Sequence, residues 1–317
     1  MSNVLFDAPG PKARARQRMF TIVGAVVVAV IVVLVVYKLN SAGQFEAKMW
    51  DVFLNPNVVR TLVNGLINTI IAAILSIILS LIFGAVFGAM RVSALAPLRW
   101  ISTIVVELFR AIPLVLLILF VFLAYSQDMQ KFFDTIGLTN VFDSAGLSKN
   151  LGALASLVVG LTLYNGSVLA EIFRAGINSV PKGQREAAMS IGMRSGQTLR
   201  LILAPQAIRT MLPAIVSQAV VALKDTSLGF IIAYEEFVRT GQLIAANPQL
   251  RNYIPMAIVL MTVYVAINYS LSKFANYLST RQRRTTKLAP VNADQIALPG
   301  TVETLVDSAA GNPPTAS

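Results

Sequence analysis

The sequence predicts an all-α integral membrane protein that crosses the bilayer six times. Its 317 residues are 56% hydrophobic and only 13% charged, which is too apolar for an ordinary soluble domain. A helix needs roughly 20 mainly apolar residues to span a bilayer core of about 30 Å. Six stretches meet this requirement, at residues 19–39, 62–89, 98–125, 151–170, 213–233 and 254–278. They lack the alternating pattern of barrel strands, so we reject a β-barrel.

The first stretch follows a basic segment and is interpreted as a membrane anchor. It is longer than the apolar part of a secretory signal, which is about 7 to 15 residues, and it lacks a clear cleavage site. In the second stretch, Gly84 and Gly88 are spaced for close helix packing. Pro113 lies inside the third stretch and predicts a kink there. Residues 1–18 and 288–317 lack the apolar density of a core, so we expect both to be disordered.

Lys and Arg are concentrated before the first stretch and after the second, fourth and sixth stretches. An excess of these residues near helix ends marks cytoplasmic segments. With six helices, all four basic segments lie on one side, and both termini are therefore expected in the cytoplasm. The net charge of +11 is spread along helix ends without a nucleic-acid-binding motif. We therefore expect a lipid bilayer, and no nucleic acid, around this chain.

The chain contains neither His nor Cys. Their absence excludes disulfides, thiolate metal sites and catalysis through either side chain. The phosphate-binding motif GxxxxGK[ST] is also absent, so any ATP must be hydrolysed by a partner. We expect no catalytic residue, no metal site and no cofactor.

A polar island at residues 179–212 separates the fourth and fifth apolar stretches. Its first helix is expected to end at Gly192, and a second short helix, over 196–203, is expected to end before Pro205. Two adjacent alanines in the first helix have side chains small enough for another backbone to come close. The island is either a docking elbow or a plain link between two membrane helices.

The order of residues in this island resembles the EAA loop of bacterial ABC importer permeases. The matching positions are Glu186, Ala187, Ala188, Gly192, Ile202, Ala204 and Pro205, although Ala204 stands where that family usually has Leu. The flanking segments resemble the polar amino acid permeases of the histidine and glutamine type. These segments are ELFRAIPLVLLI from Glu107, YNGSVLAEIFRAGINSVPKGQREAA from Tyr164 and APQAIRTMLPAIVSQAVVALKDTSL from Ala204.

The resemblance implies a five-helix importer domain at residues 58–280 in a bacterial cell membrane, with 19–39 as an added helix and 179–212 as the coupling loop. It implies two ATPase subunits and an extracytoplasmic amino-acid-binding protein. It also implies a second permease subunit, for which we expect a homologue in preference to a second copy of this chain. Within the loop, Glu186 would contact the ATPase or brace the elbow, Ala187 and Ala188 would permit close docking, and Gly192 would form the turn, with Pro205 following. The extra helix and long tail resemble actinobacterial glutamate systems, so glutamate is the expected cargo.

Polar and charged side chains inside the apolar stretches are the candidates for a substrate pathway, because they are costly in a membrane. Glu171 and Arg174 are three residues apart and predict a structural ion pair. Arg110 would suit an amino acid carboxylate. For each candidate, a structural role between helices stays open beside a pathway role. The pathway candidates are Asn64, Asn68, Glu107, Arg110, Lys224 and Asp225.

A gradient-driven secondary transporter or channel is the main alternative to an ATP-driven importer. It would favour inverted repeats or matching broken helices, and the two halves of this sequence show no convincing repeat. A membrane-embedded hydrolase is a third class, but no nucleophile and base pair is evident without His or Cys.

Overall fold

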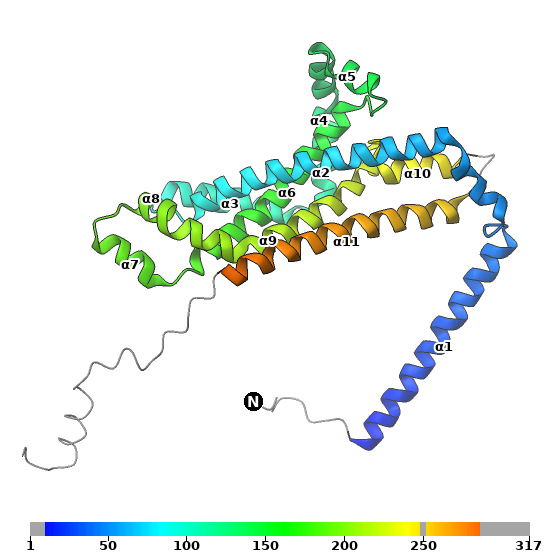
Figure 1. Cartoon of the computed structure of the whole chain (residues 1–317), viewed down its shortest axis with the longest axis horizontal. Helices are drawn as coiled ribbons and strands as arrows, with labels where there is room; N and C mark the ends of the chain where they lie inside the picture. Colours follow the sequence, from blue (N-terminus) through cyan, green and yellow to red (C-terminus); the bar gives the residue numbers. More distant parts are fainter. Residues whose placement is uncertain (1–9, 248–251, 286–317) are drawn as a thin grey trace, which may run out of the picture. The chain divides into compact units, whose positions relative to one another are not determined.

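The structure, a computed structural model, describes residues 10–247 and 252–285. In these ranges every regular element is helical (Figure 1). Six helical segments are long and apolar enough to cross a membrane, which confirms the predicted number. They are Lys12–Ser41, Pro56–Arg91, Leu114–Thr135, Leu151–Asn178, Ser195–Ile232 and Tyr253–Lys273. The tail at 288–317 and residues 1–9, both expected to be disordered, lie outside the described residues.

The elements follow one another in a simple order along the chain. They are α1 (Pro11–Ser41), the 3₁₀ helix η1 (Ala47–Leu54), α2 (Pro56–Arg91), α3 (Ala96–Ala111), α4 (Leu114–Thr135), α5 (Leu138–Ser144), α6 (Leu151–Asn178), α7 (Lys182–Ser190), α8 (Ser195–Gln197), the π-helical η2 (Thr198–Leu203), α9 (Ala204–Asp225), the 3₁₀ helix η3 (Thr226–Ile232), α10 (Phe237–Ala245) and α11 (Tyr253–Thr285). The packing described below lies within residues 1–272.

Helix α6 is the centre of the packing and contacts α2, α3, α4 and α9. Its small residues let neighbouring helices come close. A Cβ on Gly84 of α2 would lie 2.6 Å from Leu169 Cβ, and one on Gly88 would lie 2.7 Å from Phe173 Cβ. The predicted packing role of this glycine step is therefore confirmed.

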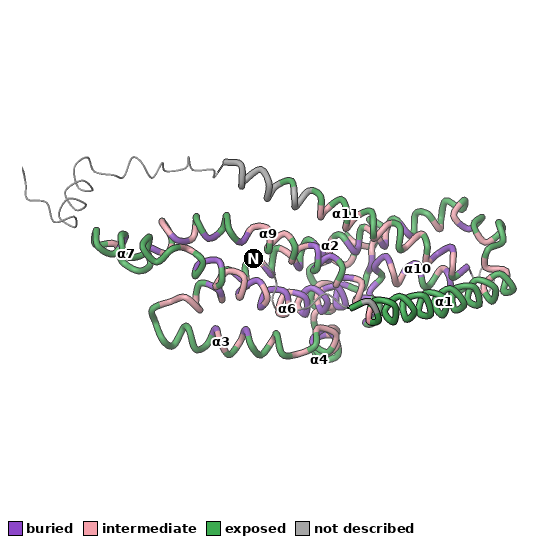
Figure 2. Tube along the Cα trace, turned by 90° about the horizontal axis from the view of Figure 1, so that it is seen from below, coloured by how far each residue is buried: buried purple, intermediate pink, exposed green. Residues whose placement is uncertain are grey.

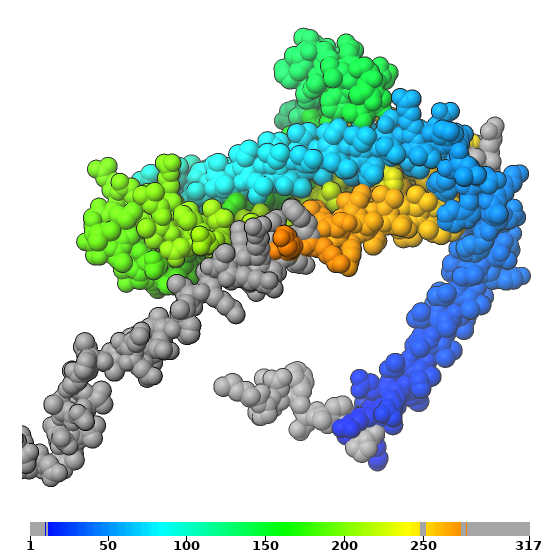
Figure 3. Space-filling model, viewed as in Figure 1, coloured from blue at the N-terminus to red at the C-terminus, as the bar shows by residue number. Residues whose placement is uncertain are grey.

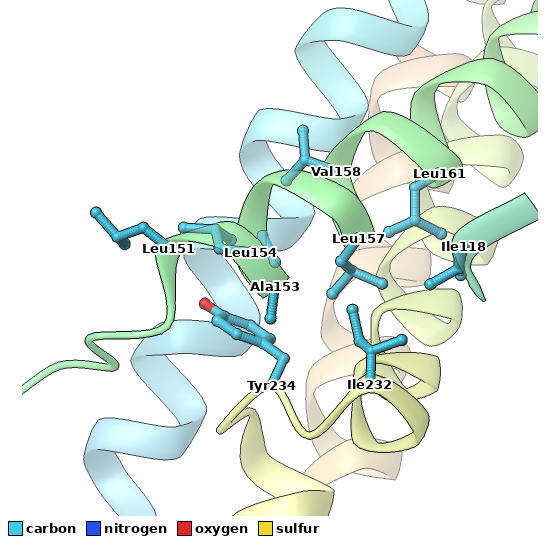
Figure 4. Close-up of a cluster of buried hydrophobic side chains, with 10 residues drawn as sticks. Ile118, Leu151, Ala153, Leu154, Leu157, Val158, Leu161, Ile232 and Tyr234 are labelled. Carbon is cyan, nitrogen blue, oxygen red and sulfur yellow. The ribbon is translucent and has the colours of Figure 1, made fainter. Parts of the chain in front are cut away.

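The largest apolar cluster surrounds the first half of α6. Figure 4 shows Ile118 of α4 and Ile232 of η3 turned toward Leu157 and Leu161 of α6. Figure 2 shows buried residues gathered along α6, whereas α1 is exposed along its length. Because residues 19–36 of α1 are almost entirely apolar, their surface requires lipid or another chain as its surroundings.

The third apolar stretch is not one kinked helix over 98–125, as the sequence predicted. Helix α3 ends at Ala111, and α4 begins at Leu114. Ile112 between them is extended, with φ −81° and ψ 128°. Pro113 is the reason, because its ring disfavours the helical conformation of the preceding residue and it has no N–H to donate. The membrane-spanning part consequently shifts to Leu114–Thr135.

Three predicted boundaries also differ from the structure. Helix α1 begins at Pro11, so the expected disorder of 1–18 does not hold for 11–18. The second helix of the elbow does not end before Pro205, since α8, η2 and α9 follow without a break. Pro205 lies in the first turn of α9, directly after the π-helical turn changes the hydrogen-bond register. The fifth stretch tightens into η3 after Asp225 instead of staying α-helical to residue 233.

Candidate functional site

The elbow between α6 and α9 presents most of α7 to the surroundings. Glu186 and Ala187 are exposed, whereas Ala188 is only 4% exposed and faces its own chain. Of the two alanines expected to permit close docking, only Ala187 is therefore open to another chain, whereas Ala188 packs inside this one. Helix α7 rests on η2, and Gln206 Nε2 donates to Gln184 Oε1 at 3.3 Å. Figure 3 shows these yellow-green residues forming one end of the helical core.

Gly192 ends α7 as predicted, in the left-handed conformation with φ +83°. The Gly192 N–H donates to Met189 O at 3.0 Å, and the Met193 N–H donates to Ala188 O at 3.1 Å. These two bonds form a Schellman motif, which satisfies the last carbonyls of the helix. The next helix, α8, starts at Ser195, and the N–H of its N-cap residue Arg194 donates to Gln197 Oε1 at 2.9 Å. The elbow is thus a pair of helical segments joined by a hydrogen-bonded turn.

Arg91, at the end of α2, joins the predicted charge pairs into one network. Its Nη1 lies 2.7 Å from Glu171 Oε2, and its Nη2 lies 3.0 Å from Glu107 Oε1. The predicted Glu171–Arg174 pair is present, with Arg174 Nε 3.0 Å from Glu171 Oε1. Arg110 Nη1 lies 3.9 Å from Glu107 Oε1. The network connects α2 and α3 to the part of α6 that leads into the elbow.

Asn64 and Asn68 of α2 line a cavity of about 440 Å³ together with the loops before α6 and α10. Asn64 Nδ2 donates to Gly146 O at 2.8 Å. Asn68 Nδ2 donates to Glu235 O at 2.9 Å, and its Oδ1 accepts from the Ser148 N–H at 3.4 Å. Both amides therefore hold loops against α2 while they border the cavity.

Glu236, directly before α10, is a buried carboxylate that is not among the candidates predicted from the sequence. Its oxygens accept from the N–H groups of Arg239 at 2.6 Å and Val238 at 2.8 Å, and so cap α10. Tyr264 of α11 donates its hydroxyl to the same carboxylate at 3.2 Å. Burial raises the pKa of Glu236 to about 7. The complete set of donors around Glu236 could be found only from the fold, because Tyr264 lies 28 residues away in the sequence.

Lys224 and Asp225, adjacent at the end of α9, point to different neighbours. Asp225 Oδ2 accepts from Asn165 Nδ2 at 3.5 Å, and Asn165 Oδ1 accepts from Gln218 Nε2 at 2.6 Å. Asn165 is fully buried near the middle of α6, so this polar cluster lies at mid-span depth. Sequence reasoning missed both amides.

Lys224 faces the other way and lines a groove of about 710 Å³ between α9, α10 and α11. The groove also contains the side chains of Tyr264 and Asn268 beside apolar residues. In the described part of the chain, no carboxylate lies within 4.0 Å of the Lys224 ammonium. Such a cation in a membrane span is costly unless water, a ligand or another chain meets it.

The sequence matches the family described as "Binding-protein-dependent transport system inner membrane component" over residues 80–284. It is 40% identical over 247 residues to the glutamate transport system permease protein GluD of Corynebacterium glutamicum, covering 77% of this chain and 84% of that protein. It is 33% identical over 192 residues to the glutamate/aspartate import permease protein GltK of Escherichia coli, covering 61% and 80%.

Solved structures show the same fold. A crystal structure of an amino acid ABC transporter with histidines matches with a TM-score of 0.56 at 24% identity, covering 70% of this chain and 94% of that one. An inward-facing structure of the MetNI methionine ABC transporter matches with a TM-score of 0.54 at 17% identity, covering 72% and 99%. The chain therefore belongs to the binding-protein-dependent transport system inner membrane component family, as a multi-pass permease of the ABC importers for polar amino acids.

Proposed function

We propose that this permease is driven by two separate ATPase subunits, one of which docks on its α7 elbow. The observation that carries the proposal is the exposed α7, which is held by the Gly192 turn and is connected through α6 to the Arg91 network. A push on α7 would pass along α6 to the helices that pack around it. In the proposed assembly a homologous second permease subunit pairs with this chain, and both termini lie in the cytoplasm with the elbow.

The proposed cargo is glutamate, delivered by an extracytoplasmic binding protein. The names of the relatives GluD and GltK support this choice. Two cations support it physically, because Lys224 faces an open groove and Arg110 has only a long contact of 3.9 Å to Glu107. Either group could pair with a carboxylate of the amino acid. Asn64, Asn68 and Asp225 would then shape the route between the outer cavity and this groove.

The domain extents follow the same proposal. Residues 58–280 would form the importer domain, 179–212 its coupling loop, and 19–39 a peripheral helix outside that domain. The relative GluD supports these extents only for the share of the chain that it covers, which is 77%.

The test is co-purification of the membrane chain with its ATPase from co-expressing cells. Glu186→Arg places a bulky cation on the exposed face of α7, and we expect at least a tenfold loss of retained ATPase, as several lost or repelled contacts produce. Asp128→Arg is the matched control, because Asp128 is also exposed but lies on α4, which is not part of the elbow. Equal retention by both variants would contradict docking on α7. Uptake without any ATPase would favour a gradient-driven transporter or channel.

A further inference from the structure

A second cavity, of about 550 Å³, lies between the α2–α3 turn and the elbow. Its charged lining consists of Arg99 from α3 and Arg185 from α7. Ser195 supplies a hydroxyl group, and Leu95 is among the apolar side chains that form the rest of the wall. The cavity thus combines two cations and a hydroxyl group with an apolar surface.

The two cations of this cavity lack partners within the described chain. Neither the Arg99 nor the Arg185 guanidinium makes an ion pair or a side-chain hydrogen bond there, whereas nearby Arg91 and Arg174 are both paired. An oxyanion in the cavity would meet both guanidinium groups together.

The surroundings of the cavity indicate where that oxyanion comes from. The membrane span of α2 ends at Arg91, just before the turn that forms one wall. On α3, Trp100 is 67% exposed beside Arg99, and Ile101 and Ile104 continue an exposed apolar surface. Tryptophan is enriched at the membrane boundary, and basic pockets between membrane helices on the cytoplasmic side bind anionic lipid head groups. A headgroup in the cavity could therefore lay its chains along α3.

We propose that this cavity binds the phosphate of an anionic phospholipid in the leaflet next to the elbow. Placing that leaflet on the cytoplasmic side rests on the proposed orientation of the chain. Because Arg99 belongs to α3 and Arg185 to α7, one bound phosphate bridges the α2–α3 hairpin and the elbow. The lipid thereby braces the elbow against the α2–α3 hairpin.

The proposal is tested by titrating the purified full chain in a neutral detergent with dihexanoyl phosphatidylglycerol, dihexanoyl phosphatidylcholine or inorganic phosphate. The readout is Trp100 fluorescence in a Trp50→Phe background, since the chain has only two tryptophans. We expect saturable binding of phosphatidylglycerol and none of phosphatidylcholine. Arg99→Gln and Arg185→Gln should each weaken binding roughly fivefold to tenfold, as one cation near a phosphate does. Arg209→Gln is the control, because Arg209 is exposed on α9 but does not line the cavity.

The outcomes separate the possible occupants. Competition by inorganic phosphate at similar concentration identifies a soluble phosphate as the occupant and overturns the proposed lipid, whereas saturable binding of phosphatidylglycerol without such competition supports the lipid. Unchanged phosphatidylglycerol binding in both arginine variants overturns the proposal, provided that their thermal unfolding midpoints match the parent without lipid. If those variants bind lipid normally but lose the ATPase, the cavity is an ATPase contact and the proposal is wrong. Loss of lipid binding with the ATPase retained supports the lipid site. Failure of the lipid proposal would leave the proposed docking of the ATPase on α7 unaffected.

Discussion

Replacing Gly192 with Ala should loosen the elbow through backbone strain alone. Gly192 has φ +83°, and a Cβ added there would meet no atom within 4 Å. The left-handed conformation costs a residue with a side chain roughly 1 to 2 kcal/mol. That energy changes a local opening equilibrium by a factor of about 5 to 30. The turn should therefore open more often while the rest of the chain stays folded.

Hydrogen exchange of the full chain in lipid nanodiscs measures this opening. The amides at 192 and 193 donate to Met189 and Ala188, and their exchange should accelerate by the same factor in Gly192→Ala. Gly183→Ala is the matched control, since its Cβ is also free of neighbours but its backbone is ordinary helix. Alanine there should slow exchange slightly, because it is a better helix former. Equal exchange rates in the two variants would refute the assigned role of the turn.

Three further changes test the packing and the charges. Arg91→Gln should lower the free energy of unfolding in detergent by about 2 to 4 kcal/mol, because it leaves two carboxylates without their shared cation. Lys131→Gln, which breaks an exposed pair, should cost about 0 to 1 kcal/mol. The pKa of Glu236 is raised from 4.5 to about 7, so stability should fall by up to about 3 kcal/mol as pH rises between these values, and Glu236→Gln should remove that slope. Gly84→Val should lower the free energy of unfolding by about 1 to 3 kcal/mol, because the larger side chain overlaps α6. Gly24→Val on the exposed α1 should leave that free energy unchanged.

Features that depend on nearby residues could be predicted from the sequence. Apolar length predicted the number of spans, and the sequence around Gly192 predicted the end of α7, because a glycine after a helical run favours the left-handed turn. The spacing of Glu171 and Arg174 predicted their contact, since residues three apart share a helix face.

Features that depend on tertiary packing could not be predicted. Arg91 was interpreted only as an orientation signal, because its two carboxylates come from helices 16 and 80 positions away. The sequence could not distinguish the buried Ala188 from the exposed Ala187, because burial depends on how α7 packs. At Pro113 the sequence could not distinguish a kink from a complete break, which depends on whether neighbouring helices hold the two segments in line.

Uptake of labelled glutamate into proteoliposomes tests the central claim most directly. The full chain is reconstituted with its second permease subunit, its ATPase and its binding protein, and uptake is compared with ATP alone and with a proton or sodium gradient alone. The exposed elbow and the absence of a phosphate-binding motif predict uptake with ATP, loss of uptake in Glu186→Arg, and no uptake from a gradient. Uptake that follows the gradient and persists without the ATPase would contradict the account.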